Sequence, residues 1–245
     1  MGTRERIDLL LLERRLVTSR EEGRGKILAG EVLVDDRPVT KAGTFVATDA
    51  AIRLRTAPMA YASRGGFKLE KALREFHVNV AGKTALDVGA STGGFTDCLL
   101  IHGAARVFAV DVGYGQLAWK LRTDNRVVVF EKTNIRYLQP SALPTVPDLA
   151  TIDVSFISLK LVLSQVKSLL IRRGQIIALI KPQFEVGKGK VGKGGVVRSH
   201  EEHLRVIDEV RAAGEQLGFT VRGVTESPLL GPKGNKEFLI HLTQN

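Results

Sequence analysis

The chain has one cysteine, few histidines and no long apolar run, and each scarcity argues against a class of protein. Its 245 residues include only Cys98 as a cysteine, so an intrachain disulfide is impossible and a reducing, cytoplasmic location is expected. The longest apolar run near the start, Ile7 to Leu12, is interrupted by Asp8, so we expect neither a signal peptide nor a membrane partner. The five histidines share no metal-ligand spacing, and no metal is predicted.

A glycine-rich segment, D-V-G-A-S-T-G-G-F-T at 87–96, is the most informative feature present. It follows a predicted apolar strand at 84–88 and precedes a predicted helix, whose first N–H groups lack partners in the helix. Asp111 closes the next predicted strand 22 residues after Gly89, where an acidic side chain can accept hydrogen bonds from a ribose. The pattern predicts an adenosine pocket.

The segment departs from the dinucleotide fingerprint G-x-G-x-x-G, because Ser91 stands where the second glycine would be. NAD is therefore disfavoured, and S-adenosylmethionine is the favoured cofactor. A glycine turn that only packs a helix on a sheet is the alternative. Asn134, after the third strand, could contact the adenine or only shape a turn. The expected cofactor contacts are Asp87, Gly89, Ala90, Ser91, Thr92, Gly93, Gly94, Phe95, Asp111, Asn134 and Asp153.

Basic residues outnumber acidic ones by 36 to 26, a net charge of +10. This excess favours a polyanionic partner without distinguishing nucleic acid from a membrane surface. The charge is concentrated in places, notably in the segment 181–198, so one surface is expected to face an anion.

The sequence predicts two domains joined by a linker at 59–66, because Pro58 directly before it and Gly65 and Gly66 at its end fit no periodic element. Residues 1–58 indicate a small α+β domain with helices at 6–14 and 19–29 and strands at 31–34, 37–39 and 51–54. Ser19 is expected to cap the second helix, with Glu22 three residues later.

Residues 67–245 indicate an α/β domain with a Rossmann-like, doubly wound sheet of seven strands. After a helix at 67–76, five strands alternate with helical patterns, at 84–88, 106–110, 126–131, 148–153 and 175–180. Two further strands, at 219–226 and 236–243, are joined by a connection too short for a crossover helix and should pair antiparallel.

Charged residues end two neighbouring strands of this predicted sheet. Asp153 follows the fourth strand and Lys181 follows the fifth. Ordinary solvated strand ends would explain either residue alone. Because ligands bind beyond the carboxyl ends of parallel strands, both residues are expected at the rim that also holds the glycine loop.

The chain resembles the TlyA (haemolysin A) family, whose members join an alpha-L, S-four-type RNA-binding domain to an FtsJ-like methyltransferase domain. The motifs that carry the resemblance are S-R-G-G-F-K-L at 63–69, the 87–96 loop, D-V-S-F at 153–156, I-K-P-Q-F-E at 180–185 and G-N-K-E-F at 234–238. The resemblance implies a Lys-Asp-Lys-Glu catalytic tetrad at Lys68, Asp153, Lys181 and Glu237. Glu237 is assigned on this basis alone.

Membership of such a family implies 2′-O-methylation of ribosomal RNA, best described for cytidines in both ribosomal subunits. The expected partners are ribosomal RNA or ribosomal subunits, and nothing in the sequence indicates an oligomeric state. Lys181 is the residue expected to contact the 2′-oxygen, where an amine can polarise the hydroxyl, accept its proton or stabilise the developing alkoxide.

Basic residues in both domains are expected to contact RNA. A solvated helix face is the alternative for those in the first domain, and a plain surface loop is the alternative for the lysines beside Lys181. The expected contacts are Arg6, Arg14, Arg15, Arg20, Arg24, Lys26, Arg64, Lys188, Lys190 and Lys193. Two other functions stay open: a ribosome-assembly factor that has lost catalysis, and a membrane-active haemolysin.

Overall fold

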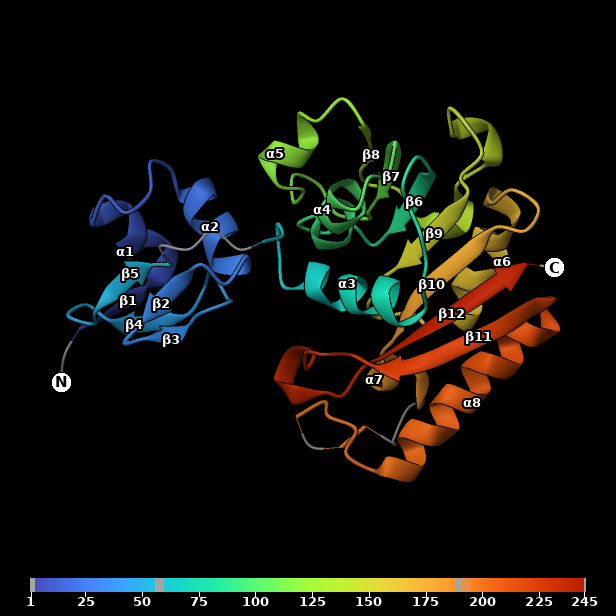
Figure 1. Ribbon diagram of the computed structural model, residues 1–245. Coiled ribbons are helices and arrows are strands. Elements are labelled where there is room, and N and C mark those ends of the chain that lie inside the picture. Colours follow the sequence, from blue (N-terminus) through green and yellow to red (C-terminus); the bar gives the residue numbers. More distant parts are fainter. Residues whose placement is uncertain (1–2, 56–59, 188–190, 193, 245) are drawn as a thin grey trace. The chain divides into compact units, whose positions relative to one another are not determined.

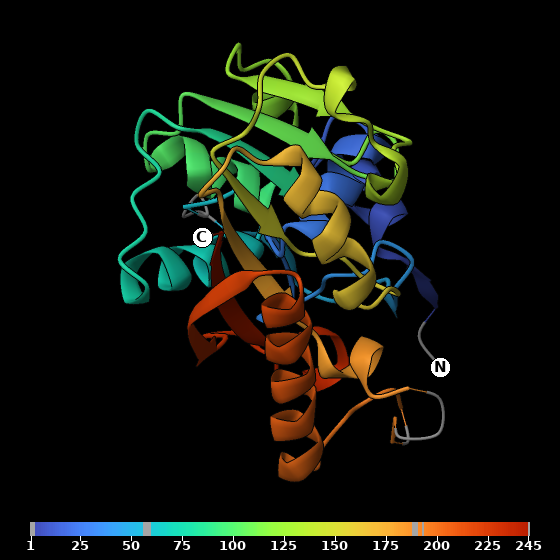
Figure 2. The ribbon, with the colours of Figure 1, turned by 90° about the vertical axis from the view of Figure 1, so that its right-hand side faces the viewer.

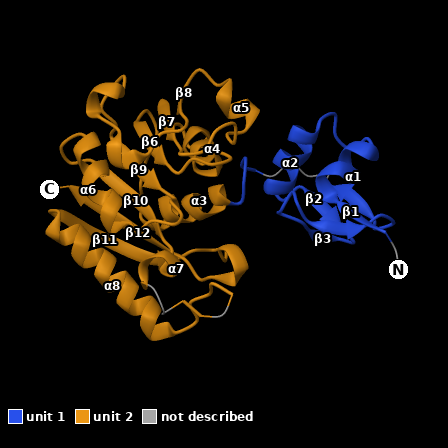
Figure 3. Ribbon diagram, turned by 180° about the vertical axis from the view of Figure 1, so that it is seen from behind, with its two compact units in different colours: residues 1–64 blue, residues 65–245 orange. Residues whose placement is uncertain are grey.

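The computed structural model describes residues 3–55, 60–187, 191–192 and 194–244. The chain folds as two compact units, residues 1–64 and residues 65–245 (Figure 3). Of the predicted linker, residue 59 lies outside the described residues. Helix α3 (Gly65–Glu75) begins inside that predicted linker, so it starts two residues earlier than the sequence pattern suggested.

The first unit is an α+β arrangement of helices and short strands. Its helices are α1 (Ile7–Glu13) and α2 (Arg20–Leu28), and its strands are β1 (Arg4–Arg6), β2 (Val32–Val34), β3 (Arg37–Pro38), β4 (Phe45–Ala47) and β5 (Ile52–Leu54). Strand β2 pairs antiparallel with β3 and β5, which confirms three predicted strands. Strands β1 and β4, which pair with each other, were not predicted because segments this short carry no alternating apolar pattern.

The core of the first unit forms where α1 meets α2 and the sheet. Helix α1 contributes Ile7, Leu10 and Leu11, whose spacing places them on one face of the helix. Helix α2 begins at its predicted cap, because Oγ of Ser19 accepts a hydrogen bond from the backbone N–H of Glu22 at 3.1 Å.

A buried carboxylate, Asp8, joins the two helices of this unit. Its Oδ1 accepts a hydrogen bond from Nε of Arg6 at 2.9 Å, and its Oδ2 accepts one from Nε of Arg20 at 3.0 Å. Burial raises the pKa of Asp8, but the hydrogen bonds from the two arginines outweigh that effect and lower it overall. Arg6 and Arg20, both expected RNA contacts, are therefore also structural partners of α1.

The second unit is built on the predicted seven-stranded sheet, whose order is β11-β12-β10-β9-β6-β7-β8. Strands β6 to β10 pair in parallel and β11 pairs antiparallel with β12, as expected, and β12 also pairs antiparallel with β10 (Figure 1). The strands are β6 (Thr84–Val88), β7 (Arg106–Val110), β8 (Val127–Phe130), β9 (Leu149–Ile152), β10 (Gln175–Ile180), β11 (Phe219–Glu226) and β12 (Phe238–Gln244).

Helices cover both faces of this sheet (Figures 1 and 2). On one face, α6 and α8 pack against alternate strand residues such as Leu86 and Ile152. On the other face lie α3 and α4, which contact each other. Besides α3, the helices are α4 (Gly94–Ile101), α5 (Trp119–Arg122), α6 (Lys160–Leu169), α7 (Pro182–Glu185), α8 (His200–Gln216) and the 3-10 turns η1 (Ile135–Tyr137), η2 (Pro140–Ala142) and η3 (Pro232–Gly234).

A membrane-crossing helix would need a long apolar stretch. Among the described residues, no helix combines the length and the apolar character that a bilayer span requires.

The Asp8 contacts predict a local stability effect in the first unit. In Asp8→Asn the side chain keeps its size but loses its charge and one acceptor oxygen. Because both arginines are partly solvated, we expect the free energy of unfolding of the first unit to fall by only about 1–2 kcal/mol. Amides of α1 and α2 should then exchange with solvent roughly tenfold faster, measured by hydrogen exchange on the full chain. Asp36→Asn, at an exposed pair with Arg53, is the control; equal exchange in the two variants would contradict the assignment.

Candidate active site

The glycine loop connects β6 to α4 through a backbone that only glycine adopts easily at two positions. Gly89 has a φ of +84°, and a Cβ there would lie 2.6 Å from the carbonyl oxygen of Asp153. Gly93 caps α4 with a φ of +96°, and a Cβ there would clash with Leu121. The loop therefore makes a tight turn directly against the neighbouring strand end.

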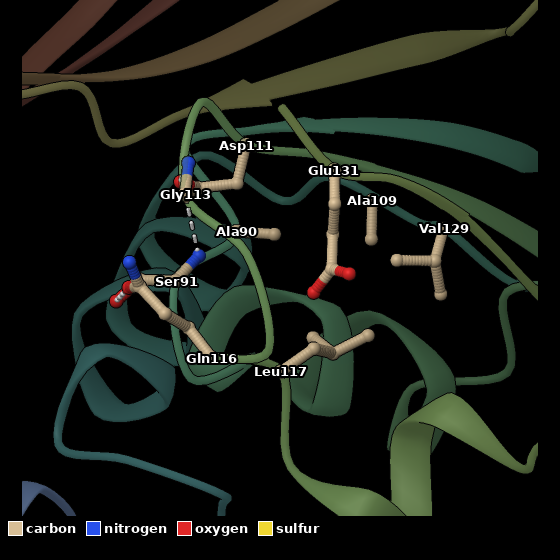
Figure 4. Close-up of a pocket in the computed structure, with 9 residues that line it drawn as sticks. All are labelled: Ala90, Ser91, Ala109, Asp111, Gly113, Gln116, Leu117, Val129 and Glu131. Atoms are coloured by element: carbon tan, nitrogen blue, oxygen red, sulfur yellow. Dashed lines mark hydrogen bonds between the residues drawn. The ribbon is translucent and has the colours of Figure 1, made fainter. Parts of the chain in front are cut away.

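Asp111 organises the pocket beside this loop. One carboxylate oxygen accepts a hydrogen bond from the backbone N–H of Ser91 at 2.8 Å, and the other accepts one from Gly113 at 2.7 Å. The pocket is small and partly open to solvent (Figure 4). It is lined by Ala90, Ser91, Ala109, Asp111, Gly113, Gln116, Leu117, Val129 and Glu131. Three of the predicted cofactor residues, Ala90, Ser91 and Asp111, thus meet in one cavity.

The other predicted cofactor residues lie outside this lining. Asp87 is fully buried under the loop, where it accepts hydrogen bonds from Thr96 Oγ1 at 2.6 Å and Thr151 Oγ1 at 3.0 Å. Asn134 caps the turn η1 by accepting from the N–H of Arg136, which is the turn role anticipated for it. The remaining ones are Gly89, Thr92, Gly93, Gly94, Phe95 and Asp153.

Burial makes Asp87 hard to ionise. It raises the pKa of the Asp87 carboxyl to about 7, against the hydrogen bonds from Thr96 and Thr151, which lower it. The negative charge of Asp153 raises the pKa further. Asp87 therefore supports the loop from beneath and stays near its protonation midpoint at neutral pH.

Glu131 was not predicted, although it lines the pocket. Its carboxylate accepts a hydrogen bond from the N–H of Gly115 at 2.8 Å and forms an ion pair with Arg122. The hydrogen bond from Arg122 lowers the pKa of Glu131. These contacts hold the segment between β7 and α5 over the pocket. The one sequence signal for Glu131 is a charge placed directly after an apolar strand.

The four residues of the expected tetrad form two ion pairs. Nζ of Lys181 lies 2.5 Å from Oδ1 of Asp153, and Nζ of Lys68 lies 2.5 Å from Oε2 of Glu237. Lys181 and Glu237 are both buried. Because Ile180 of β10 pairs with Phe238 of β12, Lys181 and Glu237 flank opposing positions at adjacent strand ends.

The segment after Asp153 adds groups that sequence reasoning missed. Oγ of Ser155 accepts a hydrogen bond from Nζ of Lys181 at 3.0 Å. Phe156, with a φ of +64° and 90% of its surface exposed, lies beside the ring of Phe184 at a centroid distance of 5.0 Å. Glu185 anchors the end of this segment by accepting from the N–H of Leu159 at 2.8 Å. These residues lie in the D-V-S-F and I-K-P-Q-F-E motifs, which was the sequence signal for them, whereas their contacts depend on tertiary structure.

The approach to Glu237 is fixed by Asn235 and Gly231. The Asn235 side chain accepts from the N–H of Val197 at 3.0 Å and donates to the carbonyl of Gly195 at 2.9 Å. A Cβ on Gly231 would collide with the carboxylate of Glu237. The segment around Gly195 is therefore tied to the strand that presents Glu237.

The predicted RNA contacts of the first unit occupy two kinds of position. Arg14 donates to the carbonyl oxygen of Ala50 at 2.7 Å, and Lys26 pairs with Glu31 at 3.2 Å, so both have internal partners like Arg6 and Arg20. The predicted contacts with exposed side chains and no acidic partner described are Arg15, Arg24 and Arg64. Lys188, Lys190 and Lys193 lie outside the described residues.

Metal ligands were not expected from the sequence. Within the described part of the chain, no three His, Cys, Asp or Glu side chains gather as metal ligands would. A metal-free site stays a prediction.

Two family models match the chain. A model of the FtsJ-like methyltransferase matches residues 61–244, and a model of the S4 domain matches residues 5–52. The chain belongs to the FtsJ-like methyltransferase family. These matches confirm the predicted union of a methyltransferase domain with an S4 domain, and S-adenosylmethionine as the cofactor.

Relatives of this FtsJ-like protein match it over most of its length. The 16S/23S rRNA (cytidine-2'-O)-methyltransferase TlyA of Mycobacterium tuberculosis is 47% identical over 243 residues, 99% of this chain and 91% of that protein. Hemolysin A of Brachyspira hyodysenteriae is 42% identical, covering 91% of this chain and 93% of its own. A solved structure from Streptococcus thermophilus, named as a hemolysin, has a TM-score of 0.78 and 42% identity, covering 100% of this chain and 90% of that one. The resemblance to the TlyA family is confirmed.

The burial of Asp87 predicts a pH dependence of stability. The folded protein holds the Asp87 proton more tightly than the unfolded chain, whose ordinary pKa is 3.8. Its contribution to the free energy of unfolding therefore falls as pH rises from about 4 to about 7, by at most about 1.4 kcal/mol per pH unit. Asp87→Asn, which stays neutral, should gain stability relative to wild type over this range in urea unfolding.

Comparing the stability of Asp87→Asn with that of wild type at each pH cancels the contribution of the other titrating groups. Burial lowers the pKa of His241 to about 4, so its contribution to the free energy of unfolding falls as pH falls, opposite to that of Asp87. This contribution is the same in wild type and in Asp87→Asn. Stability curves that run parallel from pH 5 to pH 8 would contradict the role of Asp87.

Proposed function

We propose that this chain transfers a methyl group from S-adenosylmethionine to the 2′-hydroxyl of a ribose in ribosomal RNA, with cytidine as the target nucleoside. The observation that carries the proposal is the pair of lysine–carboxylate contacts, Lys181–Asp153 and Lys68–Glu237, at the sheet rim beside the glycine loop. The Mycobacterium tuberculosis relative is named for this reaction on cytidine.

The residues around the pocket fit the expected cofactor. The turn at Gly89 packs the glycine loop against the backbone of Asp153, and the carboxylate of Asp111 faces the pocket at the position typical of a ribose contact. S-adenosylmethionine supplies a methyl group on a positively charged sulfur. The backbone of Asp153 contacts the glycine loop, and its side chain contacts Lys181. The site proposed for the methyl donor therefore adjoins the site proposed for the ribose that accepts the methyl group.

Lys181 is the residue proposed to contact the 2′-oxygen. Asp153 and Ser155 hold its amine from two sides before any substrate arrives. A cation fixed in this way would stabilise negative charge that develops on the oxygen as its proton passes to water. It would also hold the oxygen in line with the methyl carbon, from which the sulfur would leave as a neutral thioether. Lys68, held by Glu237, is proposed to position the same end of the substrate.

Phe156 is proposed to receive the target base. A phenylalanine that is 90% exposed and follows Ser155, a contact of Lys181, offers a stacking surface, and its ring lies against that of Phe184. Enzymes that modify a nucleotide inside folded RNA commonly extrude it and stack its base on such a ring. The ribose would then lie at Lys181.

The S4 unit is proposed to hold the RNA, and ribosomal subunits are proposed as the natural partner, in the cytoplasm. The intact ion pairs and glycine loop favour an active enzyme over a non-catalytic assembly factor. The haemolysin alternative is supported by names of relatives, whereas the transferase proposal also has the site geometry.

Removal of Lys181 tests the reaction. Labelled methyl transfer to protein-free ribosomal RNA and to purified subunits should yield a ribose-methylated nucleoside with wild type and fall by at least about 100-fold in Lys181→Ala. Lys160→Ala, at an exposed lysine paired with Glu209, should retain full activity. No transfer by wild type to any of these RNAs would favour the assembly factor, and a base-methylated product would refute the proposed chemistry.

Exposed arginines of the first unit test its role in RNA binding. Arg24→Ala removes an exposed charge from α2 and introduces a better helix former, so the fold should persist. RNA affinity should drop, and the slope of log affinity against log salt should flatten by about 1. Glu21→Ala, on the same helix, should not weaken binding. An unchanged salt slope in Arg24→Ala would remove this residue from the interface.

A further inference from the structure

Two aromatic side chains stand out of the second unit in the segment that follows β7. Tyr114 is 71% exposed and Trp119 is 75% exposed, and Val112 beside them is also exposed. Single exposed apolar residues are common on soluble proteins, but three within eight residues of one segment mark a surface.

The two rings do not serve the cofactor pocket. Gly113, Gln116 and Leu117, from the same segment, line that pocket, whereas Tyr114 and Trp119 are not part of its lining (Figure 4). The segment thus has an inner face toward the pocket and an outer face that carries the rings.

The backbone beneath the rings is held in place. The N–H of Gly115 donates to Glu131 at 2.8 Å, the N–H of Lys132 donates to the carbonyl of Gly113 at 2.9 Å, and the N–H of Ala118 donates to the carbonyl of Thr92 at 3.2 Å. Rings on a fixed backbone bind a partner with a small loss of conformational entropy.

Basic side chains lie beside the rings. Nζ of Lys132 lies 4.7 Å from the centre of the Tyr114 ring, in a cation–π contact. Lys120 follows Trp119 directly and is exposed, although its Nζ pairs with Oδ2 of Asp97 at 2.6 Å, and the neighbouring acid Glu131 is engaged by Arg122. Aromatic faces combined with the cation of Lys132 match single-stranded nucleic acid, whose bases stack and whose phosphates are negative.

We propose that the outer face formed by Tyr114, Trp119 and Lys132 binds unpaired nucleotides of the substrate RNA, away from the ribose that is methylated. Bases stack on the two rings, and Lys132 contacts a phosphate. This inference rests on the proposed function, since it takes RNA as the substrate.

Trp119 is the one tryptophan of the chain, so its fluorescence reports on this surface alone. Protein-free ribosomal RNA and a single-stranded oligocytidylate are titrated into wild type with saturating S-adenosylmethionine throughout. Stacked bases should quench the emission, with the same midpoint as RNA binding measured by filter retention. Filter retention of either RNA with unchanged Trp119 emission would overturn the proposal, as would no binding of either RNA.

Variants separate stacking from other effects. Tyr114→Ala and Trp119→Ala should each weaken RNA binding by about 5- to 100-fold, while Trp119→Phe, which keeps a ring, should bind nearly as wild type. The affinity for S-adenosylmethionine should not change. Leu161→Ala, at an exposed apolar residue on α6, is the matched control and should bind RNA normally.

The outcomes distinguish this proposal from the proposed function. If wild type and both alanine variants bind and methylate RNA equally, the surface is refuted and the reaction stands. If RNA quenches Trp119 but no ribose is methylated, the surface stands and the reaction fails. Variants impaired only on intact subunits, with normal binding to free RNA, would indicate a protein partner and overturn the RNA assignment.

Discussion

The close approach of Gly89 to the backbone of Asp153 is the constraint on which both parts of the site depend. A Cβ at Gly89 would lie 2.6 Å from the Asp153 carbonyl oxygen, and the N–H of Asp153 donates to Val88 at 2.9 Å. The end of β9 is thereby locked to the start of the glycine loop. A larger residue at position 89 would displace Asp153 and, with it, the amine of Lys181. The glycine loop and the carboxylate of Asp153 therefore cannot move independently.

The lysines and carboxylates near the contact of Gly89 with Asp153 form ion pairs. Each tetrad lysine faces one carboxylate, so no amine of the tetrad is buried without a counter-ion. Asp87, beneath the loop, would add a second negative charge near Asp153; burial chiefly, and the charge of Asp153 to a smaller extent, raise the pKa of its carboxyl. The site keeps its amines in fixed positions before the substrate arrives, which is the condition for electrostatic catalysis without reorganisation.

Sequence patterns predicted the sheet well because its strands are apolar runs between clear breaks; β6, β7, β10 and β11 have the predicted bounds. They failed for β1 and β4, whose three-residue pairings depend on tertiary contact. Asp111 could be placed from spacing, whereas Glu237 needed the family resemblance. Ser155 and Glu131 escaped prediction because their partners, Lys181 and Gly115, lie far away along the chain. A polar residue acquires such a role only once the fold has brought its partner to it.

Under the proposed RNA contact, the segment that runs from β7 into α5 would serve two ligands. Its inner face carries Gln116 and Leu117 toward the pocket, and its outer face carries Tyr114 and Trp119 toward solvent. Two consecutive residues after β8 support the two faces separately: Glu131 holds the backbone of Gly115 from within, and Lys132 lies over the Tyr114 ring. A nucleoside on the inner face and a base on the outer face would act on the same backbone. Loss of the Glu131 contacts would therefore loosen both surfaces at once, whereas loss of an exposed ring would affect only one.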